Sequence, residues 1–156
     1  MTLYLALKVA HIIGAAMLFG TGAGIAFFML MAHRTRDPRL IAHTAEIVIL
    51  ADFLFTASAV VVQPVTGAWL AYIAGYHLFS GWVGLSLALY LVTGACWLPV
   101  VAIQMKLRDL ARTAASLGKP LPARYDQLFW VWFVLGFPAF AAVLAIIGLM
   151  VAKPSF

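Results

Sequence analysis

Apolar residues fill four long segments of the chain, and short polar stretches separate them. Each segment exceeds the roughly 20 residues with which a helix crosses a bilayer. The pattern predicts spans at 3–32, 41–73, 82–104 with a helical extension to 116, and 125–151. Small water-soluble domains do not bury helices of such length, so the expected fold class is all-α: an integral membrane four-helix bundle that forms a single domain.

The composition also favours a membrane protein. Hydrophobic residues make up 65% of the chain and charged residues only 10%, with a mean hydropathy of +1.05. A surface with so few charges suits a lipid bilayer rather than water. A formal net charge of +5 is also typical of nucleic-acid-binding proteins. Because the Lys and Arg residues stand at the span ends, where membrane topology explains them, we expect no nucleic-acid partner.

The distribution of basic residues predicts the orientation. Eight of the ten Lys and Arg residues lie in two alternate connections, after the first span and after the third. Positively charged connections stay in the cytoplasm. Both termini are therefore expected on the non-cytoplasmic side, in a multi-pass protein of the bacterial inner membrane. The eight residues are Arg34, Arg36, Arg39, Lys106, Arg108, Arg112, Lys119 and Arg124.

Two ionisable side chains, Lys8 and His11, lie inside the first span. They are three residues apart and share a helix face, and ionisable groups at this depth are costly unless they are paired or used. Ala15 and Gly22 on the same face leave a groove beside the histidine, which favours a flat ligand. The prediction is a heme b with His11 as ligand of the iron and Lys8 at the propionates. The alternative is that His11 only hydrogen-bonds to a neighbouring helix, with Gln63 nearest in depth.

The second span carries a row of polar residues. Asp52, Thr56 and Gln63 align on one face, because eleven residues are close to three helical turns, and Glu46 points about 120° away. A carboxyl group as deep as that of Asp52 rarely faces lipid. The row predicts either a proton relay or an intramembrane polar network of structural hydrogen bonds.

The third span carries the most regular polar stripe. Such a face must meet the polar faces of other helices, and we expect Asp52 to face it near Tyr90, Thr93 or Trp97. The fourth span is almost wholly apolar and is expected to seal the bundle against lipid. The stripe residues fall within about 40° of one another on a 3.6-residue period: Ser86, Tyr90, Thr93, Trp97, Gln104 and Arg108.

Small residues recur every fourth position of the first span, at Ala16, Gly20 and Gly24. This spacing lets another helix approach closely. The stripe serves packing within the bundle or contact with a partner, and it is the predicted surface for a homo-oligomer or a larger membrane complex.

Motifs across nearly the whole chain carry a resemblance. They are Leu7-Lys8-x-x-His11-Ile12-x-Gly14, Phe19-Gly20-Thr21-Gly22-x-Gly24-x-Ala26-Phe27-Phe28, Ala51-Asp52-Phe53-x-Phe55-Thr56, Gln63-Pro64-Val65-Thr66-Gly67-x-Trp69-Leu70, Cys96-Trp97-Leu98-Pro99-Val100-Val101-x-x-Gln104 and Lys153-Pro154. The chain resembles a family of predicted bacterial four-span integral membrane proteins of unknown function. That resemblance implies the fold and no particular reaction.

A more distant resemblance concerns heme. Lys8-x-x-His11-Ile12, His33, and Gly67-x-Trp69-Leu70 followed by a tryptophan-led third span are similar to the heme-containing protoporphyrinogen oxidase family and its copper-resistance-D-like relatives. In that family the first-span histidine is implicated in heme binding, which carries over to His11. The chain lacks that family's lysine early in the third span and its tyrosine-histidine pair at the end of that span.

Three functions follow as hypotheses. A b-type heme membrane redox protein, for electron transfer or heme- or porphyrin-linked oxidation, would use His11 and Lys8, with Asp52 or Gln63 at proton or quinone contacts. A non-catalytic subunit or assembly partner of a larger complex would use the small-residue stripe. A small proton-coupled transporter would use Asp52, although four spans without an inverted repeat are few for transport.

Overall fold

The computed structural model describes residues 2–155, and within them four helical rods are long and apolar enough to cross a membrane. The predicted all-α architecture of four long helices is therefore confirmed. The first rod is α1, Leu3–Thr35. The second is α2, Pro38–Ala51, which continues through the π-helical turn η1, Asp52–Thr56, into α3, Ala57–Ile73. The third is α4, Gly81–Ser116, and the fourth is α5, Ala123–Ala152.

The turn between α1 and α2 is set by three adjacent residues. Arg36 takes a left-handed conformation, with φ 56°, and ends α1. The Asp37 carboxylate accepts a hydrogen bond of 2.8 Å from the Arg39 backbone N–H, which caps the start of α2. Pro38 follows at the first helical position, where its missing N–H is no loss. The second rod consequently begins at Pro38 rather than at residue 41.

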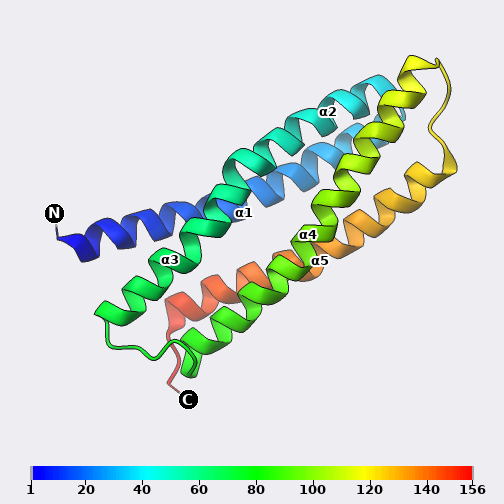
Figure 1. Ribbon diagram of the computed structural model, residues 1–156. Helices are drawn as coiled ribbons and strands as arrows, with labels where there is room; N and C mark the ends of the chain where they lie inside the picture. The colour runs from blue at the N-terminus through cyan, green and yellow to red at the C-terminus, as the bar shows by residue number, and fades with distance from the viewer. Residues whose placement is uncertain (1, 156) are drawn as a thin grey trace.

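The helices pack in two pairs (Figure 1). The α1 helix runs along α2 and α3, and α4 packs along α5. The α2 helix joins the pairs by packing on the last part of α4. The connections α1–α2 and α4–α5 lie together at one end of the bundle. Most of the basic residues lie in these connections or in the helix segments next to them, and we call this end the basic end. The chain termini and the α3–α4 connection lie toward the opposite end, which we call the terminal end.

The hydrophobic core occupies the half of the bundle near the basic end. Aromatic residues of α5 fill its centre, so the fourth span contributes core residues as well as a lipid-facing surface. In the other half, Cβ atoms added at Gly20, Gly22 or Gly94 would meet no other atom within 4 Å, so these helix faces are open. The core residues are Ile25, Met29, Ala32, Ile41, Ala42, Ala45, Val48, Leu107, Ala111, Tyr125, Phe129 and Trp132.

Candidate functional site

His11 is the centre of a polar contact between α1 and α3. Its side chain is buried, with 9% of the residue exposed, and Nδ1 lies 2.8 Å from the Thr66 hydroxyl oxygen. That hydroxyl donates its one hydrogen to the Val62 carbonyl, at 2.8 Å. The Thr66 oxygen must therefore accept from His11 Nδ1–H, since the hydroxyl has a single proton. This assignment leaves the lone pair on Nε2 available, as in an imidazole that binds a metal.

Gln63 makes the second contact between the same helices. Its buried side-chain amide donates a hydrogen bond of 2.7 Å to the main-chain carbonyl of His11. The sequence therefore identified the right neighbour, but the partner of the imidazole ring is Thr66. Thr66 follows Gln63 by three residues and shares its helix face, which is the signal that could have found it.

Two glycines make room for these contacts. A Cβ at Gly14 would lie 2.5 Å from Gln63 Nε2, and a Cβ at Gly67 would lie 3.1 Å from His11 Cε1. Each glycine thus faces the polar side chain of the opposite helix. We call the group formed by His11, Gly14, Gln63, Thr66 and Gly67 the α1–α3 clamp. It fixes both the position and the tautomer of a buried histidine.

Lys8 lies one turn from His11 toward the terminal end of α1, and its side chain is exposed. No carboxylate in residues 2–155 comes within ion-pair distance of its ammonium group. Of the other predicted groove residues, Ala15 is partly buried and the face at Gly22 is open. The position of Lys8 suits a cation that meets an anionic group near the membrane surface.

Asp52 faces the third span, as the sequence predicted. Its residue is 4% exposed, and Trp97 Nε1 donates to Oδ1 at 3.2 Å. Asp52 begins the π-helical turn η1, and Thr56 ends it. The Thr56 hydroxyl is buried and has no hydrogen-bond partner among the described residues. Single π-turns inside α-helices are frequent at functional sites, so Asp52 remains a candidate functional residue.

Tyr90 has a structural partner. Pro64 has no N–H with which to bond the carbonyl of Val60, four residues earlier in the helix. The Tyr90 hydroxyl donates to that Val60 carbonyl and replaces the missing bond. Thr93 bonds the Leu89 carbonyl of its own helix at 3.0 Å. Neither side chain therefore extends a chain of hydrogen bonds from Asp52.

Removing the Tyr90 hydroxyl is expected to destabilise the bundle. Tyr90→Phe leaves a buried carbonyl without a donor, and a loss of about 1 kcal/mol in unfolding free energy is expected. In a Pro64→Ala background the new N–H can bond Val60, so the same change is expected to have less than half that effect. Titration from mild detergent into SDS measures all four proteins. Equal losses in both backgrounds would show that the Val60 carbonyl is not the partner that matters.

The remaining polar candidates lie closer to the basic end. Glu46 is exposed, and its carboxylate lies 3.6 Å from Arg112. Gln104 is fully buried, with Oε1 accepting from Trp132 Nε1 at 3.1 Å and with Nε2 unpartnered within residues 2–155. The polar residues expected in one network thus occupy separate groups along the bundle. No continuous line of hydrogen bonds joins these groups in the part of the chain described.

An aromatic stack that the sequence did not reveal lies at the basic end. The His33 ring stacks on Phe129 with centroids 3.7 Å apart and on Tyr125 at 5.8 Å. Beyond it, Arg36 forms a bidentate pair with Asp126, at 2.5 and 3.0 Å, and this carboxylate raises the pKa of Arg36 above its usual value. The pair joins the end of α1 to the first turn of α5. His33 is thus occupied in packing rather than placed free at the membrane surface.

The small-residue stripe of α1 stays uncovered. Ala16 and Gly20 are exposed, and near Gly24 a Cβ would meet only Phe28 of the same helix, at 3.9 Å. Within residues 2–155, no helix packs closely over these positions. The stripe is therefore free to contact a molecule outside the chain.

The described residues hold no cluster of three or more His, Cys, Asp or Glu side chains that suits a metal ion. Among the residues of the clamp, His11 carries the one imidazole. No curated protein and no solved structure matches the chain. A family model does match, from residue 5 near the start of α1 to residue 154 after α5, so that it covers all four helices. The chain belongs to the family of predicted integral membrane proteins DUF2269.

Proposed function

We propose that the protein is a b-type heme-binding membrane redox protein and that His11 is the axial ligand. The observation that carries the proposal is the hydrogen bond of 2.8 Å between His11 Nδ1 and Thr66, which leaves Nε2 as the ligating nitrogen. Histidines that bind metals usually donate their other N–H to a fixed acceptor in this way. This hydrogen bond therefore supports His11 Nε2 as the atom that would hold a heme iron.

The residues of the clamp have separate tasks in this proposal. Thr66 holds the tautomer and the ring plane, and Gln63 fixes the backbone of α1 at His11. Gly67 provides the space that the ring occupies. Lys8, exposed toward the terminal end, supplies a cation for the propionates. A bound heme would supply reversible one-electron chemistry, suited to electron transfer or to heme- or porphyrin-linked oxidation.

The other histidines lie away from the clamp. His33 lies in the last turn of α1, His43 lies in the second turn of α2, and His77 is exposed in the α3–α4 connection. The proposal therefore assigns a single histidine, His11, to hold the heme iron.

A visible spectrum of the protein purified from cells grown with a heme precursor tests the proposal. A Soret band that shifts when the sample is reduced is expected. A protein that shows no Soret band as isolated, and none above free heme after titration with hemin, would end the heme proposal.

A non-catalytic subunit or assembly partner is the second candidate. The observation that favours it is the stripe of exposed Ala16 and Gly20 and half-buried Gly24, a surface suited to a helix of a second copy or of a larger membrane complex. In that case the clamp holds α1 and α3 together so that the stripe keeps its shape. Gly20→Leu, which places a bulky side chain on the stripe, tests this candidate.

We also infer the orientation and the membrane. Eight of the ten basic residues lie in the two connections at the basic end or in the helix segments next to them, which supports a cytoplasmic basic end in the inner membrane of a bacterium. A reporter that works only in the cytoplasm is expected to give no signal at the C-terminus and a strong signal in the α4–α5 connection at Gly118. The reverse pattern would invert the topology.

A further inference from the structure

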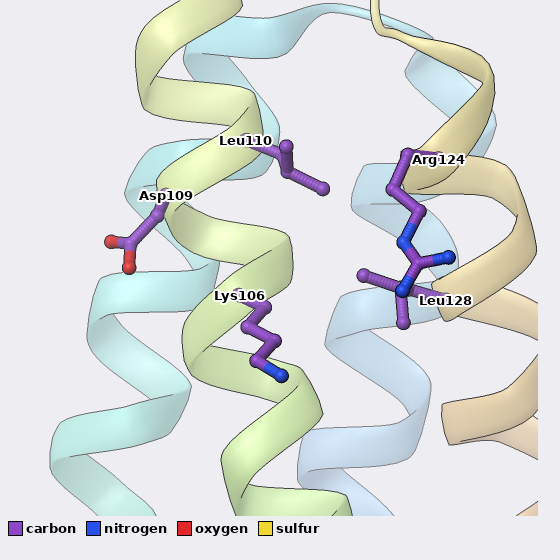
Figure 2. A pocket seen from close by; sticks show the side chains of 5 residues that line it. All are labelled: Lys106, Asp109, Leu110, Arg124 and Leu128. Carbon is purple, nitrogen blue, oxygen red and sulfur yellow. The ribbon is translucent and has the colours of Figure 1, made fainter.

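A groove of about 240 Å³ lies between α4 and α5 at the basic end. It is lined by Lys106, Asp109, Leu110, Arg124 and Leu128 (Figure 2). Lys106 lies two residues after the predicted third span, and Arg124 directly precedes the predicted fourth. The groove therefore lies at the depth where the hydrocarbon region gives way to the lipid headgroups.

The charges that face the groove are positive. Figure 2 shows the side chains of Lys106 and Arg124 directed into the space between the two helices, while the Asp109 carboxylate points away from it. Asp109 is instead paired with Arg108 at 2.8 Å. Neither Lys106 nor Arg124 has an ion-pair partner within residues 2–155. Two cations that face one groove without a carboxylate between them favour an anionic ligand.

The start of α5 adds to this preference. Its N-cap residue is Pro122, and no side chain caps the first turn. The positive end of the helix dipole lies at Arg124, where it favours a phosphate. The groove therefore combines side-chain cations with the positive end of a helix.

Apolar residues complete the groove. Leu110 and Leu128 form its apolar lining, and Val131, one turn further along α5, is exposed on the lipid-facing surface. A free inorganic ion gains nothing from contact with these apolar side chains, whereas a phospholipid places its acyl chains along them. We propose that this groove binds the headgroup phosphate of an anionic phospholipid from the leaflet at the basic end.

Native mass spectrometry of the full-length protein in detergent, with added phosphatidylglycerol, tests the site. The Lys106→Gln/Arg124→Gln variant is expected to bind the first lipid about tenfold more weakly than the wild type. The matched control is Arg34→Gln/Arg39→Gln, which removes two exposed cations from the α1–α2 region at the same end. It is expected to stay within about twofold of the wild type, because these cations lie outside the groove.

A further variant, a second lipid and inorganic phosphate distinguish a lipid phosphate site from other causes of the adduct. The charge-conserving Lys106→Arg/Arg124→Lys variant is expected to bind like the wild type. This result would show that the glutamine variant binds weakly because it lacks the two charges, rather than because substitution at these positions disturbs the fold. Phosphatidylcholine is expected to bind weakly and equally to all variants, and millimolar inorganic phosphate is expected to leave the phosphatidylglycerol adduct in place. An equal loss of phosphatidylglycerol binding in the control pair, binding of phosphatidylcholine as strong as that of phosphatidylglycerol, or displacement of the lipid by inorganic phosphate would each overturn the proposal.

Discussion

The His11→Ala variant is expected to lack the Soret band that we expect of the purified wild-type protein. The ring nitrogen that would hold the iron is removed, while Thr66 and Gln63 remain in place on α3. His77→Ala is the matched control, because His77 is exposed in the α3–α4 connection. It is expected to keep the full band. Absorbance at the Soret maximum per protein, before and after hemin titration, measures both.

Thr66→Val separates ligation from tautomer control. This variant keeps the His11 ring but removes the acceptor that fixes Nδ1–H. Heme affinity is expected to fall by about 10- to 100-fold, as for other partners of metal-binding histidines. A His11→Ala protein with an unchanged spectrum would place the heme elsewhere. Unchanged heme affinity in Thr66→Val would show that the His11–Thr66 hydrogen bond does not control heme binding.

The four helices were predictable because hydropathy and length alone determine which segments cross a bilayer. The helix ends were less predictable, since they depend on single residues. Asp37 caps α2 through the Arg39 N–H and thereby begins the second rod at Pro38. A single capping residue leaves the hydropathy of the span almost unchanged, so the hydropathy pattern does not show where the helix begins.

The side-chain groups were predictable only in part. Alignment of Asp52 with Gln63 assumes a regular helix of 3.6 residues per turn, but the π-helical turn Asp52–Thr56 lies between them. Each such turn inserts about one residue, or about 100° of rotation, into the helix. Asp52 consequently meets Trp97 on α4, whereas Gln63 meets His11 on α1. The sequence gives no signal of the π-turn itself.

Trp132 carries a hydrogen-bond donor that its classification as an apolar residue conceals. The fourth span is almost wholly apolar by sequence, yet the indole N–H of Trp132 donates to the buried side-chain amide oxygen of Gln104. An indole is a large apolar group with one N–H, and when it is buried that N–H usually finds an acceptor. Tryptophan residues in apolar spans should therefore be matched with the buried amides of neighbouring helices before a span is assigned to lipid contact alone.

Gly67→Leu is expected to destabilise the protein strongly. A Cβ at this position already lies 3.1 Å from His11 Cε1, and the ring is held by Thr66 and cannot move away freely. Overpacking of this kind lowers the unfolding free energy by about 1 to 3 kcal/mol. Loss of the His11–Thr66 hydrogen bond adds about 1 kcal/mol to that effect. Unfolding in SDS of the heme-free protein measures the loss without any contribution from a ligand.

Gly20→Leu is the matched control for Gly67→Leu and also tests the partner surface. It makes the same chemical change in a helix, but a Cβ there meets no atom within 4 Å. The free energy of unfolding of the monomer is expected to stay the same or to rise by up to about 1 kcal/mol, because leucine favours a helix more than glycine does. If the stripe seats another helix, the bulky side chain is also expected to dissociate that complex, seen as a smaller particle in size-exclusion chromatography. Equal destabilisation by both leucines would show that close packing at Gly67 is not what holds α1 to α3.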